Sequence, residues 1–431
     1  MSMIFAKSGP LRGEITVPAD KSISHRAVML GSLAEGESLI RNLSNGEDVR
    51  STVRCMGQFG VEIVPEEGLH RIKGKGWAGL KEPADVLNCG NSGTTMRMLA
   101  GIASSRPFLT VLTGDDSLRR RPMARVIEPL TAMGAAILGR YNSRFAPLAI
   151  RGEDLRGISY ELAVASAQVK SAILLAGLAA TGETVVAERV KSRDHTERML
   201  SQMGATIKIQ GNLTRISGPC LLSPQEWVIP GDISSAAFWM IAASLVPGSE
   251  IIIRDVGVNP TRTGILEVLQ AMGARIETEN YRVTGGEPRA DIVVKHSDLR
   301  PVEIKGEIIP ALIDEIPVLA VAMAMTSGVS TVKDASELRA KESDRIAMIV
   351  NSLRLMGVAV EENEDGFVVH GTGHIPGNAR VSSGGDHRMA MSSAIAGLVA
   401  DSPVTVEGFD SVSVSYPGFQ EDLTRLLKSP S

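Results

Sequence analysis

The feature that most constrains the fold of this chain is an internal repeat. A strand-like run, a small polar turn and an apolar helix-like run recur in the same order six times, and a β-rich run follows each copy. One residue marks the turn in each copy: Ser22, Ser92, Ser166, Ser234, Asp314 and His387. The copies lie about 72 residues apart, a period typical of repeat architectures. The chain is therefore predicted to be built from six similar units.

A second periodic signal supports this reading. A helical run that ends in glycine and opens into a strand occurs at Gly60, Gly134, Gly204, Gly273 and Gly357. Glycine just past a helix is a common left-handed terminator. Each unit is therefore expected to alternate helices and strands, which indicates an α/β fold.

The two most similar copies lie three units apart. VPADKS at 17–22 and IPGDIS at 229–234 indicate a tandem duplication of three units. We therefore expect two domains, one formed by residues 20–230 and one by residues 1–19 together with 231–431.

Two of the helical runs, 165–180 and 234–246, are apolar nearly all round and are expected to be buried. The strands would then form outer sheets around such helices, an inside-out barrel in each domain. Helix N-termini carry free N–H groups and partial positive charge. Several of them aimed at one interdomain cleft would bind a substrate with more than one anionic group.

Composition excludes several classes of partner. The net charge of −4 gives no electrostatic case for nucleic acid or an anionic membrane, and 3% aromatic residues argue against a base-stacking surface. No apolar run approaches the length of a membrane span, and the N-terminus has no signal-peptide pattern. The three cysteines do not form a disulfide framework. We expect a cytoplasmic monomer that acts on small molecules.

Six motifs could carry chemistry, and each also has a plain structural reading as a cap, a tight turn or a solvated charge run. They are DKSISHR (20–26), NCGNSGTTMR (88–97), LRRRPM (118–123), LIDEIP (312–317), ELRAKESDR (337–345) and GGDHRMAM (384–391). Acids within an apolar run, such as Asp314 and Glu315, favour a functional role because burying a charge is costly. The charge-dense run 337–345, taken alone, is typical of an exposed helix start. No zinc or calcium signature is present.

In this order, the motifs resemble those of the enolpyruvyl transferase family, over essentially the whole chain. They are most similar to the branch of that family that uses shikimate 3-phosphate. The resemblance implies transfer of the enolpyruvyl group of phosphoenolpyruvate to the 5-hydroxyl of shikimate 3-phosphate, with release of phosphate. It also implies addition and then elimination through a tetrahedral intermediate, without metal or cofactor. In this family the herbicide glyphosate competes with phosphoenolpyruvate.

The resemblance assigns residues to three roles. Residues that would bind shikimate 3-phosphate are Lys21, Ser22, Arg26, Ser166, Ala167, Gln168, Ser192, Asp314 and Lys341. Residues that would bind phosphoenolpyruvate are Lys21, Gly93, Arg121, Gln168, Arg345 and Arg388. Asp314 would accept the proton of the 5-hydroxyl and Glu342 would exchange a proton with the methylene carbon, with Lys21 as a third catalytic group.

Several positions depart from familiar members of the family. Ala167 stands where many have a second serine, which puts one phosphate hydrogen bond in doubt. Other departures are Ser92, Thr95, Met98, His195, Glu337 and Val414.

Two other functions remain as alternatives. One is the sister activity on UDP-N-acetylglucosamine, whose members usually carry a cysteine in the loop that here reads DDSLRRRPM. The other is a non-catalytic anion-binding module, against which Asp314 and Glu342 argue. Phosphate release with either acceptor would separate them.

Overall fold

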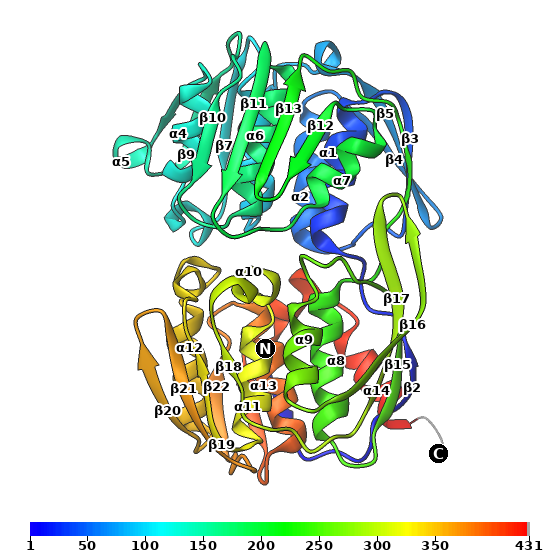
Figure 1. The fold of residues 1–431 in the computed structure, drawn as a ribbon, viewed down its shortest axis with the longest axis vertical. Helices are drawn as coiled ribbons and strands as arrows, with labels where there is room; N and C mark the ends of the chain where they lie inside the picture. Colours follow the sequence, from blue (N-terminus) through cyan, green and yellow to red (C-terminus); the bar gives the residue numbers. More distant parts are fainter. Residues whose placement is uncertain (429–431) are drawn as a thin grey trace. The chain divides into compact units, whose positions relative to one another are not determined.

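The computed structural model describes residues 1–428 and has a mixed α/β fold (Figure 1). The chain forms two compact units. Unit 1 comprises Met1–Pro18, Pro230–Arg282 and the chain from Pro288 onward; unit 2 comprises Ala19–Ile229 and Val283–Glu287. Each unit has its own hydrophobic core.

Unit 2 contains three four-stranded sheets, each with one parallel pair followed by antiparallel neighbours. In spatial order the sheets are β14 (Glu226–Val228), β3 (Glu35–Arg41), β5 (Leu69–Lys75), β4 (Glu62–Glu66); β6 (Leu87–Asn88), β7 (Leu109–Thr113), β9 (Phe145–Arg151), β8 (Ala136–Gly139); and β10 (Ser159–Leu162), β11 (Gly182–Glu188), β13 (Leu213–Gly218), β12 (Ile207–Gln210).

The described part of unit 1 also contains three sheets, two with four strands and one with three. They are β2 (Arg12–Ile15), β15 (Glu250–Gly257), β17 (Glu287–Lys295), β16 (Arg275–Thr284); β18 (Glu303–Ile304), β19 (Ser327–Val332), β21 (Gly366–Thr372), β20 (Ala359–Asn363); and β22 (Ala379–Ser382), β23 (Val404–Glu407), β1 (Ser2–Phe5). The N-terminal strands complete two of these sheets, since β1 pairs antiparallel with β23 and β2 pairs parallel with β15.

Many of the helices pack against these sheets. The α-helices of unit 2 are α1 (Lys21–Leu33), α2 (Glu47–Gln58), α3 (Gly93–Ala103), α4 (Ala124–Ala132), α5 (Arg140–Ser143), α6 (Ala167–Ala179) and α7 (His195–Gln202). Those of unit 1 are α8 (Ile233–Leu245), α9 (Gly264–Ala271), α10 (Ile309–Leu312), α11 (Ile316–Ala324), α12 (Arg345–Leu355), α13 (His387–Val399) and α14 (Phe419–Lys428). Short 3-10 helices are η1 (Trp77–Gly79), η2 (Leu118–Arg120), η3 (Gly306–Ile308), η4 (Ser336–Ala340) and η5 (Phe409–Val414).

The most buried helices pack against sheets of their own unit and against one another. In unit 2, α6 packs against β11 and β13 (Figure 1), and it also packs against α3. In unit 1, every residue of α8, α11 and α13 is buried, and the three helices pack against one another. Among residues 1–428, no helix is both long enough and apolar enough to cross a lipid bilayer.

The polar turns explain where the buried helices begin. A side-chain oxygen accepts a hydrogen bond from a first-turn N–H at Asp20 (2.8 Å), Ser92 (3.1 Å), Ser166 (3.4 Å) and Asp386 (2.9 Å). Such caps satisfy one of the free donors of a helix start and are worth about 1 kcal/mol each.

Helices α3 and α6 approach so closely that only glycine fits at their crossing. A Cβ on Gly101 would lie 2.3 Å from the backbone oxygen of Ala172. Small residues at such a crossing allow backbones to touch, and here they fix α3 against α6.

Candidate functional site

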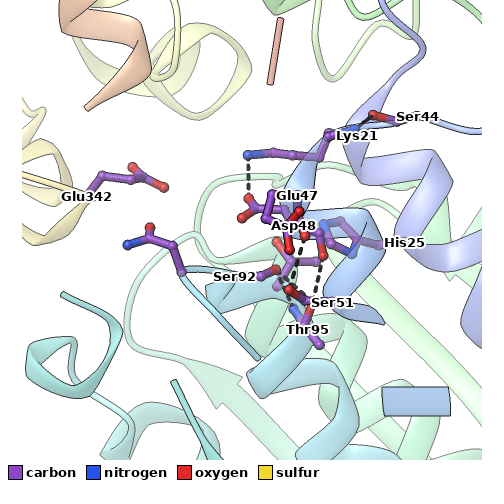
Figure 2. A network of polar contacts seen from close by, with 12 residues as sticks. Lys21, His25, Ser44, Glu47, Asp48, Ser51, Ser92, Thr95 and Glu342 are labelled. Carbon is purple, nitrogen blue, oxygen red and sulfur yellow. Dashed lines mark hydrogen bonds and ion pairs between the residues drawn. The ribbon is translucent and has the colours of Figure 1, made fainter. Parts of the chain in front are cut away.

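Lys21 is the first residue of α1, and its charge is paired within unit 2. Its Nζ lies 2.9 Å from Oδ2 of Asp48 on α2 (Figure 2). Both side chains are mostly buried, with 19% and 10% exposure. Asp48 was not singled out by the sequence, because nothing local indicates that α2 would bring an acid to the start of α1.

Arg26 lies further along α1, and each of its three guanidinium nitrogens donates one hydrogen bond. Nε donates to Oγ1 of Thr196 at 2.7 Å, and Nη2 donates to Oγ of Ser171 at 2.8 Å. Nη1 donates to the backbone oxygen of Ser22 at 2.8 Å. Burial lowers the pKa of Arg26 to about 10, against the raising effect of Glu197. The group therefore stays cationic at neutral pH.

The start of α6 carries three residues that the sequence singled out. Ser166 caps the helix, Ala167 begins it, and Gln168 reaches across to α3. Nε2 of Gln168 donates to Oγ1 of Thr94 at 2.9 Å, and its Oε1 accepts a hydrogen bond from Arg97. The first turns of α3 and α6 are thus joined by side chains.

Gly93 opens α3 between two arginines. A Cβ at this position would lie 3.1 Å from Nη1 of Arg97 and 3.4 Å from Nη1 of Arg121. Both arginines are nearly buried, with 8% and 7% exposure. Nη2 of Arg121 donates to Oδ1 of Asn91 at 2.5 Å. Arg97, which lies within the GNSGTTMR motif but was assigned no role, is a further cation at this point.

Of the three consecutive arginines in LRRRPM, only Arg121 belongs to this cluster. Arg120 is exposed, and Arg119 pairs with Asp116 on the surface. The structure therefore separates one buried arginine from two at or near the surface.

Ser192, in the loop between β11 and α7, is held by a buried ion cluster. Its N–H donates to Oε1 of Glu188 at 3.1 Å, and its hydroxyl donates to the same oxygen. Lys170 on α6 places Nζ 2.8 Å from Oε2 of Glu188 and 2.7 Å from Oε1 of Glu197. Burial alone would lower the pKa of Lys170, but the two glutamates raise it above its usual value.

Asp314 of unit 1 lies between α10 and α11 and faces three cations. Its Oδ1 is 3.1 Å from Nη1 of Arg345 and 3.5 Å from Nζ of Lys341, and its Oδ2 is 3.9 Å from Nη2 of Arg388. Nη1 of Arg388 also donates to the backbone oxygen of Asp314 at 3.0 Å.

Arg345 contacts three acids although it is 1% exposed. Nη2 lies 2.6 Å from Oε2 of Glu342, and Nε lies 2.8 Å from Oδ2 of Asp386. Burial would lower the pKa of Arg345, but Asp386, Glu342 and Asp314 raise it well above its usual range. For the buried Asp386, burial raises the carboxyl pKa, yet the Arg345 charge brings it below its usual value. The sequence assigned Asp386 no role.

Glu315 of the LIDEIP motif and His195, one of the positions that depart from the family, also have structural partners. Glu315 is buried beside Asp314, accepts a hydrogen bond from Ser234 and lies 3.5 Å from Nη2 of Arg262. His195 is buried and places Nδ1 2.8 Å from Oε1 of Glu287. Among residues 1–428, no group of His, Cys, Asp and Glu has the arrangement of a metal site.

Comparison with known proteins adds independent information. The family described as EPSP synthase (3-phosphoshikimate 1-carboxyvinyltransferase) matches residues 5–423. A 3-phosphoshikimate 1-carboxyvinyltransferase from Syntrophomonas wolfei is 52% identical over 417 residues, covering 97% of each chain, and one from Gloeobacter violaceus is 53% identical over 418 residues, covering 96% of each. A solved structure of EPSP synthase from Acinetobacter baumannii superposes with a TM-score of 0.88 at 43% identity, over 99% of this chain and 98% of that one.

Proposed function

This chain belongs to the EPSP synthase family, as the motif resemblance predicted. We propose that the charged and polar residues described above in unit 2 bind the substrates of that family's reaction, and that those in unit 1 supply the acid, the base and further cations. The reaction is a step of the shikimate pathway to the aromatic amino acids. It transfers the enolpyruvyl group of phosphoenolpyruvate to the 5-hydroxyl of shikimate 3-phosphate and releases phosphate.

We assign shikimate 3-phosphate chiefly to the starts of α1 and α6. Arg26 supplies a buried cation, and Ser22 in the first turn of α1 and Ser166 at the cap of α6 supply hydroxyl groups for a phosphate. Ser192 serves in the same way once its hydroxyl turns from Glu188 to the phosphate. Arg26 is held by side chains from α6 and α7, so its charge is positioned before substrate arrives. Ala167 offers a phosphate only its backbone N–H.

We assign phosphoenolpyruvate to the start of α3 together with cations of unit 1. Arg121, Gln168 and the glycine at position 93 meet at one point of unit 2, and Arg97 joins them. Arg345 and Arg388 are the carboxylate-binding pair, since guanidinium groups bind carboxylates through two parallel hydrogen bonds. Lys21 serves both substrates.

The acid and base are Asp314 and Glu342. The observation that carries this assignment is that both contact the buried Arg345, Asp314 at 3.1 Å and Glu342 at 2.6 Å. Asp314 takes the proton of the 5-hydroxyl as that oxygen bonds to carbon 2 of phosphoenolpyruvate, and Glu342 gives a proton to carbon 3. Elimination then returns a proton from carbon 3 to Glu342, and the departing phosphate takes up the proton that Asp314 received.

We further propose the six-unit architecture, with shikimate 3-phosphate bound chiefly by residues 20–230 and the acid/base groups in residues 1–19 plus 231–431. The parallel strand pair that recurs in the sheets of both units supports it. The protein is proposed to act as a monomer in the cytoplasm, a reducing compartment that suits its free Cys55, Cys89 and Cys220.

The test of the activity is phosphate release. Purified protein is mixed with phosphoenolpyruvate and either shikimate 3-phosphate or UDP-N-acetylglucosamine. We expect phosphate only with shikimate 3-phosphate, and mass spectrometry should detect the enolpyruvyl ether. Release with the nucleotide sugar alone would refute the assignment.

A further inference from the structure

A chain of buried polar side chains links the first three helices of unit 2 (Figure 2). Nδ1 of His25 on α1 lies 2.7 Å from Oγ1 of Thr52 on α2, which lies 2.7 Å from Oγ1 of Thr95 on α3. Oγ1 of Thr95 in turn lies 2.7 Å from Oγ of Ser92, the cap of α3. All four side chains are at most 1% exposed.

The hydrogen bonds that link these four side chains are all donated in the same direction, from His25 towards Ser92. Thr95 donates its only hydroxyl hydrogen, either to Ser92 at 2.7 Å or to the backbone oxygen of Asp48 at 3.4 Å. Thr52 must therefore donate to Thr95. Since Thr52 has then used its own hydrogen, His25 must donate to it from Nδ1.

The environment of His25 agrees with this direction. Burial lowers the pKa of His25 to about 3, against the raising effect of Asp48, so the ring is neutral at physiological pH. Nε2 is buried and has no hydrogen-bond partner within the described chain. A bare nitrogen there leaves a lone pair unused, whereas an N–H would leave an orphaned donor, which costs more.

The chain ends where the phosphoenolpyruvate subsite is proposed to begin. Oγ of Ser92 accepts from both the hydroxyl and the N–H of Thr95, which fixes the first turn of α3. At the next residue, Gly93, an added Cβ would lie 3.1 Å from Nη1 of Arg97 and 3.4 Å from Nη1 of Arg121, so both guanidinium groups lie close to this turn. A small rotation of this turn would therefore move the binding surface against its cations.

We propose that His25, Thr52 and Thr95 are positioning residues that set the phosphoenolpyruvate subsite by holding the first turn of α3 through Ser92. The inference rests on the proposed function, which assigns Gly93 and Arg121 to that subsite. None of the three residues is required to touch substrate.

Steady-state kinetics of Thr95→Val and Thr52→Val test the proposal. Each change keeps the branched shape and removes one link. Loss of one hydrogen bond should raise KM for phosphoenolpyruvate about 3- to 10-fold, while KM for shikimate 3-phosphate stays within about twofold. Thr52→Ser keeps the hydroxyl and should restore the wild-type KM. A merely structural role would lower thermal stability and kcat without moving KM, and that result would overturn the proposal.

The double variant and a control sharpen the test. Links of one chain are not independent, so Thr52→Val with Thr95→Val should raise KM no more than the larger single effect. Additive effects would contradict a single chain. The control is Ser104→Ala, which removes a buried hydroxyl at the far end of α3 that donates to the backbone oxygen of Ala100 at 2.7 Å. It should leave both KM values unchanged.

A spectroscopic measurement separates this proposal from the activity itself. In ¹⁵N NMR spectra of the wild-type protein, His25 should show the Nδ1–H tautomer throughout pH 5–8, with the signal assigned by its loss in His25→Gln. The Nε2–H tautomer, or protonation in this range, would overturn the chain whatever the enzyme catalyses. Wild-type protein without phosphate release, but with the Nδ1–H signal, would instead refute the proposed function.

Discussion

Gly93→Ala adds one methyl group beside two arginines at the start of α3, where we propose that phosphoenolpyruvate binds. The backbone of Gly93 does not have a positive φ, so alanine fits the local conformation without strain. The new Cβ would lie 3.1 Å from Nη1 of Arg97 and 3.4 Å from Nη1 of Arg121. The contact with Arg97 is tighter than ordinary van der Waals spacing and the contact with Arg121 is at its lower limit, so the Arg97 guanidinium or the ligand must move by a few tenths of an ångström.

The expected change in the KM for phosphoenolpyruvate follows from the charge-assisted hydrogen bonds that these arginines would donate to that substrate. A charge-assisted hydrogen bond is worth about 1.5–3 kcal/mol, and the displacement weakens one such bond rather than removing it. A loss of about 1–2 kcal/mol corresponds to an increase of about 5- to 30-fold in the KM for phosphoenolpyruvate. Glyphosate, which extends slightly beyond phosphoenolpyruvate in this family, should weaken more. The starts of α1 and α6 are untouched, so shikimate 3-phosphate should bind as before.

Steady-state kinetics with each substrate varied in turn would decide the matter. The matched control is Gly57→Ala on α2, where an added Cβ meets nothing within 4 Å. That variant should match the wild type in both KM values. An unchanged KM for phosphoenolpyruvate in Gly93→Ala, or equal increases for both substrates, would refute the reasoning.

Three other predictions concern the charged groups. Asp314→Asn keeps the shape of the side chain but removes the base, so kcat should fall at least about 10²-fold. Calorimetry should still detect binding of shikimate 3-phosphate to this variant. A kcat within a few-fold of the wild-type value would exclude Asp314 as the base. Lys170→Met leaves two buried glutamates without their cation and should lower the free energy of unfolding by about 3–5 kcal/mol. The control Lys73→Met breaks an exposed ion pair and should lower the free energy of unfolding by less than about 1 kcal/mol. Similar losses for the two variants in urea titrations would contradict this distinction between buried and exposed pairs. The lowered pKa of Asp386 means that its carboxylate stabilises the fold above about pH 4 and loses this effect as the pH falls. The stability difference between wild type and Asp386→Asn should therefore narrow between pH 7 and pH 3.5, and a constant difference would count against the ion pair with Arg345.

The sequence was most informative about features that are determined by residues adjacent in the chain. A capping side chain and the helix it starts are neighbours in the chain, so turns such as 20–26 and 88–97 are recognisable as helix starts from their residues alone. The motifs within those turns also carried the family resemblance, which the comparisons confirmed. The mixed α/β character followed from the alternation of the same elements.

The partners of the buried charges could not be read in this way. Arg26 meets Thr196 and Ser171, which are 170 and 145 residues away in the chain, and no periodic pattern encodes that meeting. The run 337–345, typical of an exposed helix start, contains Arg345, whose side chain is instead 1% exposed because three acids neutralise it. Only tertiary packing brings those acids together.

The contact between Gly101 and Ala172 has a mechanical consequence for catalysis. Because the backbones of α3 and α6 touch, neither helix can slide or tilt without moving the other. The two helices also share Gln168, whose side chain joins their first turns. The starts of α3 and α6, to which we assign substrate-binding residues, should therefore move together, so that adjustment to a bound ligand must come from side-chain rotation or from other segments of the chain.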